Sequence, residues 1–178
     1  MEKLVKLNAE HFARTAKVTD DEFEVVTSIT SANGFNEKGS FSARVRSGNF
    51  VRALVAKPTG VMRWQIYQSV TYSGEWRRFT SANMNIGDRL VSRELEVISR
   101  DIITCDYGLC VYREIVAITL EGSEAQALTA STNTAPGAVL SFRLKAQSGI
   151  DWDDDIPLAE LAGIARVVAD YRQKAGIK

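Results

Sequence analysis

Histidine is nearly absent from this chain, which contains only His11 among 178 residues. A Ser-His-Asp or Cys-His catalytic site would therefore have to use His11, which lies in the least regular part of the sequence. The chain also lacks a GxSxG motif and the glycine-rich phosphate motifs GxGxxG and GxxxxGKS/T. These absences leave nucleophilic catalysis and nucleotide binding without support. One enzyme class stays open, a hydrolase or sugar-active enzyme that uses strand carboxylates, with Glu94, Glu96 and Glu114 as candidates.

An excess of charge of one sign is also missing, because 22 Lys and Arg residues balance 22 Asp and Glu residues. Nucleic-acid binders usually carry a basic excess, so no nucleic-acid partner is expected. No apolar run approaches the roughly 20 residues of a membrane helix, and we predict no transmembrane segment. The N-terminal residues contain no apolar stretch of the signal-peptide kind, which fits a cytoplasmic protein and equally a mature exported protein whose signal was removed.

Cysteine is scarce as well, and the only two cysteines, Cys105 and Cys110, lie in the stretch 97–120. This stretch reads as two β-strands folded back on each other, with the cysteines facing each other across the turn. We predict a structural disulfide, which is typical of exported proteins, and the alternative is a reduced pair with no role. A thioredoxin-type motif has two intervening residues, and a metal site needs more ligands than these cysteines and His11 supply. No metal or other cofactor is therefore expected.

Period-2 alternation of apolar and polar residues is abundant, and it is the pattern of half-buried strands. It is clearest over residues 62–72, where Trp64, Ile66 and Tyr72 share one face. Further strands are predicted over residues 23–29, 41–45, 50–56, 76–82, 89–103, 110–120 and 139–146. Because the strands do not alternate with helices, the chain is predicted to be mostly β, an antiparallel β-sandwich or partly closed barrel of about eight or nine strands.

One C-terminal helix is predicted over residues 157–175, where apolar residues recur at helical spacing. Pro157 suits its first turn, and Gly163 is expected to let the helix approach the sheet closely. The preceding stretch 121–137 is rich in Ala, Ser and Thr and is predicted to be a surface connection. The whole chain, 1–178, is predicted to be a single domain, with an N-terminal segment over 1–20 and the β-sandwich over 21–146.

Two clusters of side chains invite a binding interpretation. The run Asp151-Trp152-Asp153-Asp154-Asp155 offers carboxylates to a hard cation, but it lacks the EF-hand pattern, so a solvated loop that caps the following helix is predicted. Trp76, Arg77 and Arg78 are the candidate ligand-binding residues, because aromatic rings stack on sugars or bases and arginines pair with anions. The alternative for these three residues is cross-strand packing, with the arginine stems lying over aromatic faces.

Four pieces of the sequence carry a resemblance to other proteins: FVRALVAKPTG, WQIYQSVTYSGEWRRFTSA, CDYGLCVYRE and SFRLKAQSG. Together they resemble small uncharacterised bacterial proteins that usually carry a signal peptide or lipoprotein signal, and the resemblance covers most of the chain. It implies a β-sandwich in the bacterial envelope and brings no activity with it.

The expectation from the sequence is therefore a non-enzymatic binding or structural module of the bacterial envelope, periplasmic or extracellular, with a protein or envelope component as partner. A cytoplasmic location is the alternative. The alternative functions are a small hydrolase or sugar-active enzyme, and a subunit of a larger assembly joined through an edge strand.

Overall fold

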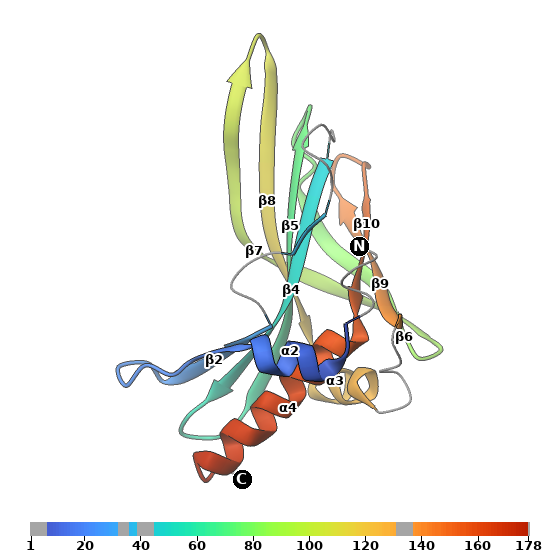
Figure 1. The fold of residues 1–178 in the computed structure, drawn as a ribbon. Helices are drawn as coiled ribbons and strands as arrows, with labels where there is room; N and C mark the ends of the chain where they lie inside the picture. The colour runs from blue at the N-terminus through green and yellow to red at the C-terminus, as the bar shows by residue number, and fades with distance from the viewer. Residues whose placement is uncertain (1–6, 32–35, 39–44, 131–136, 178) are drawn as a thin grey trace.

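The computed structural model describes residues 7–31, 36–38, 45–130 and 137–177, and its fold is drawn in Figure 1. The strands are β1 (Lys17–Thr19), β2 (Val26–Thr30), β3 (Asn36–Lys38), β4 (Val45–Ala56), β5 (Met62–Ser73), β6 (Phe79–Ile86), β7 (Arg89–Asp106), β8 (Leu109–Leu120), β9 (Val139–Ala146) and β10 (Trp152–Pro157). The helices are α2 (Ala9–Thr15), α3 (Gly122–Thr129) and α4 (Leu158–Lys174). Among the described residues, no helix is long and apolar enough to cross a membrane.

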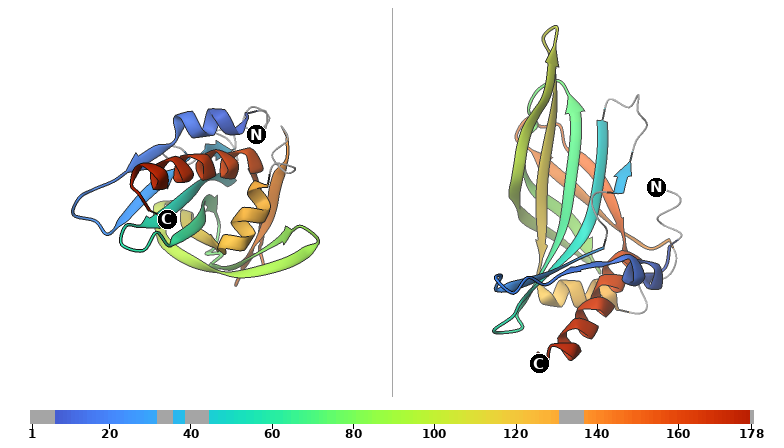
Figure 2. Two further views of the ribbon diagram at one scale, coloured as in Figure 1. Left: turned by 90° about the horizontal axis from the view of Figure 1, so that it is seen from below. Right: turned by 60° about the vertical axis from the view of Figure 1, so that its left-hand side comes forward.

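All these strands belong to one antiparallel sheet in the order β1-β2-β4-β5-β8-β7-β6-β9-β10, with β3 paired to β4. The sheet curls until its last strand approaches β4, where the Asn49 side-chain amide donates to the Asp155 carbonyl at 3.1 Å. Figure 2 shows the resulting partly closed barrel, with α3 and α4 at one end and the β7–β8 hairpin standing out at the other. The prediction of a mostly β, antiparallel fold with a C-terminal helix is confirmed, as a single curled sheet.

The core lies on the concave side of the curled sheet, and the alternation of β5 explains how it forms. Trp64, Ile66, Val70 and Tyr72 all point inward and are buried, as the sequence pattern predicted for this strand. Their neighbours in the core come from β8, β6, β9 and α4, and include Val116, Ile118, Phe79, Met84, Leu144, Leu161 and Ile164. Burial of this apolar surface supplies the main driving force for closing the sheet on itself.

The helix predicted over 157–175 is α4, and it closes the lower end of the barrel. Its apolar stripe enters the core, and its one buried acid, Glu160, accepts hydrogen bonds from the Ser31 hydroxyl and from the Val51 backbone N–H, the latter at 3.1 Å. Gly163 does not face the sheet as expected, because the helix α2 covers it. A Cβ at Gly163 would lie 2.6 Å from the Phe12 Cβ and 2.7 Å from the Ala9 carbonyl oxygen.

Two further expectations are wrong. Within the predicted surface connection 121–137, residues Gly122–Thr129 form α3, which starts at a reciprocal capping box between Glu121 and Glu124; residues 131–136 lie outside the described part. The acidic run is not a loop, because Trp152–Pro157 pairs with β9 as the strand β10. The Glu, Ala, Gln and Leu residues of α3 favour a helix locally. The aspartates of β10 are unfavourable in strands, and pairing with β9 decides the structure of this stretch.

Candidate functional site along the free edge of β7

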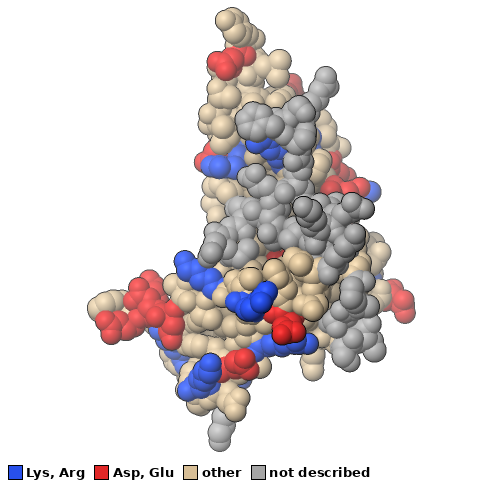
Figure 3. Space-filling model, in the orientation of Figure 1, with Lys and Arg blue, Asp and Glu red and all other residues tan. Residues whose placement is uncertain are grey.

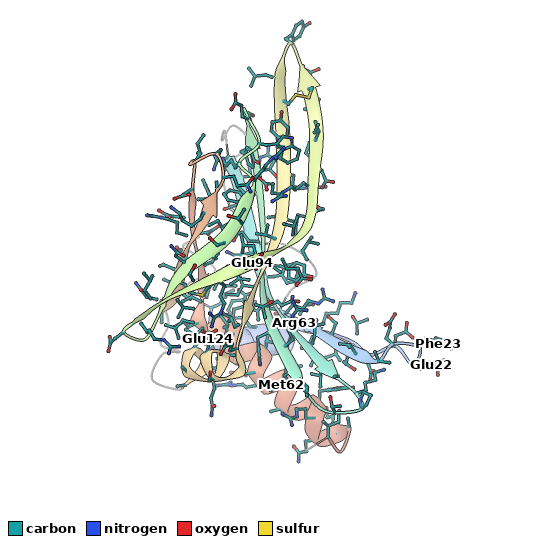
Figure 4. All side chains as sticks on the ribbon, turned by 180° about the vertical axis from the view of Figure 1, so that it is seen from behind. Glu22, Phe23, Met62, Arg63, Glu94 and Glu124 are labelled. Atoms are coloured by element: carbon teal, nitrogen blue, oxygen red, sulfur yellow. A yellow bond between two sulfur atoms is a disulfide. The ribbon has the colours of Figure 1, made fainter. Side chains whose placement is uncertain are left out.

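The strand β7 is longer than its neighbour β6, and the difference leaves an edge uncovered. β6 pairs with β7 only from Arg89 to Glu94, the residue labelled in Figure 4. Beyond Glu94, residues 95–106 pair with β8 on one side only, and no other strand among the described residues covers their other side. At roughly 3.3 Å per residue, this free edge is about 40 Å long. We call the place where β6 and β7 separate the β6–β7 gap.

Apolar side chains are exposed along this free edge. Val97 and Ile102 lie on the concave face, opposite Val116 and Tyr112 of β8, and Ile102 is 58% exposed. Ile98 and Ile103 stand where the register shifts by one residue, as in β-bulges, and both are exposed. Edge strands of soluble proteins are commonly protected by lysine, proline or bulges. Residues 95–106 contain neither lysine nor proline. The register shifts at Ile98 and Ile103 interrupt this edge, and residues 99–102 between them pair regularly with β8.

The buried carboxylate of Glu114, on β8, accepts hydrogen bonds from groups around the β6–β7 gap. It accepts from the Tyr72 hydroxyl, from the backbone N–H groups of Arg78 (2.9 Å) and Phe79 (3.2 Å), and from Nε of Arg100 (2.9 Å). Arg100 also donates to the Phe79 carbonyl at 3.0 Å. Side chains thus supply the partners that the backbone at the start of β6 does not find on β7, as buried polar groups require.

The charge on Glu114 is compensated within this network. The Arg100 guanidinium pairs with it directly, while burial and the neighbouring carboxylate of Glu114 raise the pKa of Tyr72. The Tyr72 hydroxyl therefore stays protonated and continues to donate. A sequence signal for this role existed, since Glu114 falls in the same alternation phase as Val116 and Ile118 and so had to point into the core.

The same network holds the segment that carries the three predicted ligand-binding residues. Arg78 has φ of +55°, which is uncommon for a residue other than glycine. Its N–H binds Glu114, and the carbonyls of Arg77 and Arg78 accept from the backbone N–H groups of Ser148 (3.2 Å) and Gln147 (3.1 Å). Hydrogen bonds to the N–H and to the carbonyl of Arg78 therefore maintain its strained backbone conformation beside the β6–β7 gap.

The side chains of Trp76, Arg77 and Arg78 do not converge on one pocket. The Trp76 ring packs against Tyr112 at a centroid distance of 4.4 Å. The Arg77 guanidinium lies over Tyr72 at 4.6 Å and over Trp152 at 5.8 Å, and desolvation lowers its pKa. The Arg78 side chain is exposed. For Trp76 and Arg77 the contacts are those of the packing alternative.

The predicted disulfide is present in the structure, where Cys105 and Cys110 are direct partners in the β7–β8 ladder. It closes the hairpin beyond the last residue of β8 that β5 supports, Val111. The hairpin turn therefore projects from the sheet, and the covalent cross-link constrains it in addition to the β7–β8 ladder.

Replacing both cysteines with serine is expected to loosen the hairpin locally. A disulfide that closes so short a loop contributes at most about 2 kcal/mol in the chain-entropy model. Because the tip stands beyond the strands that carry the core, backbone amides 104–111 should exchange faster by hydrogen exchange mass spectrometry while β5 keeps its protection. A drop in the protection of β5 as large as that at the tip would contradict this.

The aspartates of the acidic run form ion pairs and hydrogen bonds with neighbouring side chains and do not converge on one point. Asp153 makes two hydrogen bonds to Arg143, at 2.6 and 2.9 Å, and Asp151 pairs with Lys145. These cations hold the pKa of both carboxyls below the ordinary value. Asp154 points inward and accepts from the Gln68 amide at 3.0 Å. The charges of this run therefore join β9 to β10 and to the barrel interior.

Among the strand carboxylates proposed for glycoside chemistry, Glu114 is separated from Glu96 by the sheet. Glu96 lies on the convex face with Arg63 at 2.7 Å and Gln65 at 2.9 Å, whereas Glu114 is inside the barrel. Trp64 is buried, and Trp76 and Trp152 are half-buried, so the tryptophans form no exposed stacking platform. A shallow groove of about 500 Å³ over β6, β9 and β10 includes Arg143 and Asp153, which are paired with each other.

Known proteins give no further guide to the site. No family model, curated protein or solved structure matches the chain.

Proposed function

We propose that this protein is a non-enzymatic binding module of the bacterial envelope, which takes up an extended segment of a protein partner along the free edge of β7. The observation that carries the proposal is the uncovered edge 95–106 with its exposed valine and isoleucines. Unpaired backbone groups on such an edge can hydrogen bond to an added strand, and apolar side chains beside them provide selectivity.

One feature supports a binding role for this edge rather than a simple irregularity of the sheet. The Glu114 network holds the β6–β7 gap open without leaving its buried backbone groups unpaired. The gap is therefore a stable part of the fold, and a partner strand would find it already formed. Preorganisation of this kind reduces the entropy lost on binding.

An oxidising compartment is part of the proposal. The disulfide Cys105–Cys110 supports it, because such bonds persist in secreted and periplasmic proteins and are rare in the cytosol. The resemblance to bacterial envelope proteins points in the same direction.

The edge is tested by selecting binders from a library of random ten-residue peptides. We expect the selected peptides to alternate apolar and polar residues, and Ile102→Lys to weaken their binding at least tenfold in fluorescence anisotropy. Leu90→Lys is the matched control, because Leu90 is an exposed apolar residue of the same strand where β6 covers the edge. A failure to select peptides, or an equal loss with Leu90→Lys, would refute the edge as the binding surface.

A further inference from the structure

The turn of the β7–β8 hairpin carries an exposed aromatic residue that folding does not require. Tyr107 and Gly108 are its two central residues, both with positive φ, at +50° and +80°. This is the type I′ geometry that suits a tight hairpin, for which Asn and Gly are the usual residues. Tyr107 is fully exposed and Leu109 is 63% exposed. A bulky aromatic ring in a strained conformation, directed into solvent, indicates a contact outside the chain.

An apolar groove lies between α3, α4 and the start of β5, with a volume of about 270 Å³. Met62, Ala125 and Val168 form part of its wall, and the small side chains of Ala165 and Ala169 keep it open. Arg172 lies at its rim, where its side chain donates to the Met62 sulfur at 3.8 Å. Figure 4 locates the groove by Met62 and by Glu124 of α3.

We infer that copies of this protein associate head to tail, with the Tyr107 tip of one copy seated in the α3–α4 groove of the next. Both surfaces are apolar, since the tip exposes Tyr107 and Leu109 and the groove is lined largely by apolar side chains. They also match in charge, because Asp106 adjoins Tyr107 and Arg172 adjoins the groove. Figure 3 shows few charged side chains at the top of the hairpin.

The position of the two surfaces determines the kind of assembly. The hairpin tip and the helices α3 and α4 lie at opposite ends of the molecule (Figures 1 and 2), so one copy cannot fill its own groove. A contact between different surfaces on successive copies is heterologous, and repeating it produces a linear array or a ring. Few side chains take part, so the association is weak and depends on concentration. It uses the tip and the groove, and of the free edge of β7 it involves only Asp106 at the end.

Sedimentation velocity over a range of concentrations tests this inference. The wild-type protein is expected to show a sedimentation coefficient that rises with concentration. Tyr107→Ser removes the aromatic ring of the tip. Ala169→Glu places a larger, charged side chain in the groove, at an exposed helical position where glutamate is well tolerated. Each variant alone should sediment as a monomer. A mixture of the two retains one intact tip and one intact groove, and should form a dimer that grows no further.

Phe23→Ser is the matched control. Phe23 is 88% exposed at the turn between β1 and β2, among Asp21, Glu22 and Glu24, and its loss should leave association unchanged. That acidic turn projects at the left of Figure 3. A second test reverses the charges: Asp106→Arg and Arg172→Glu should each weaken association at least tenfold, and the double variant should restore it. A wild-type protein that stays monomeric, a mixture that does not dimerise, or association that survives Tyr107→Ser would overturn the inference.

Discussion

Replacement of Glu114 with alanine is expected to lower the free energy of unfolding by about 3–5 kcal/mol, because each buried polar group left without its partner costs about 1–3 kcal/mol. The carboxylate accepts four hydrogen bonds, two of them from the backbone at Arg78 and Phe79. Its removal leaves those N–H groups buried without an acceptor and the Arg100 guanidinium without its anion. Urea denaturation followed by circular dichroism would measure the change.

Glu94→Gln provides the control for this measurement. Glu94 is exposed on β7 immediately before the gap, and its replacement should alter stability by less than about 0.5 kcal/mol. If Glu114→Ala proved as mild as Glu94→Gln, the network would not be what maintains the β6–β7 gap, and the edge would lose its structural support. If it proved severe, peptide binding at the edge should be lost together with the fold.

Gly163→Ala is expected to destabilise the protein by about 1–3 kcal/mol, as overpacking of a tight contact does. Helix propensity alone predicts the opposite sign, because alanine is about 1 kcal/mol more favourable than glycine inside a helix. The added Cβ would come within 3 Å of backbone atoms of α2, at the Ala9 carbonyl oxygen and the Ala13 nitrogen. Since backbone atoms of a docked helix cannot move independently, α2 must shift away from α4.

The control for Gly163 is Gly122→Ala in the first turn of α3, where an added Cβ meets nothing within 4 Å. This variant should be neutral or slightly stabilising in thermal and urea unfolding. A gain in stability for Gly163→Ala that equals the gain for Gly122→Ala would show that α2 is not tightly docked. Faster amide exchange in α2 of the Gly163→Ala protein alone would support the contact as described.

Part of the binding surface could be predicted from the sequence and part could not. The hairpin 97–120 and its cysteine pair followed from alternation and a turn between them, and both are present. Trp76, Arg77 and Arg78 are candidate ligand-binding residues from the sequence, but the contacts of Trp76 with Tyr112 and of Arg77 with Tyr72 and Trp152 depend on three separate strands. An exposed edge strand is among the alternatives that the sequence offers, but its place on β7 results from the difference in length between β6 and β7 once they pair.

Local patterns in the chain determined the strand β5, the β7–β8 hairpin and the helix α4, because hydrophobic period and turn chemistry act between near neighbours in sequence. Only the tertiary structure decided that Glu114 would form hydrogen bonds across the β6–β7 gap and that Gly163 would meet α2. These features depend on the register in which distant strands pair and on which elements come into contact. The same reason applies to the tip and the groove, which come from different elements and lie at opposite ends of the folded molecule.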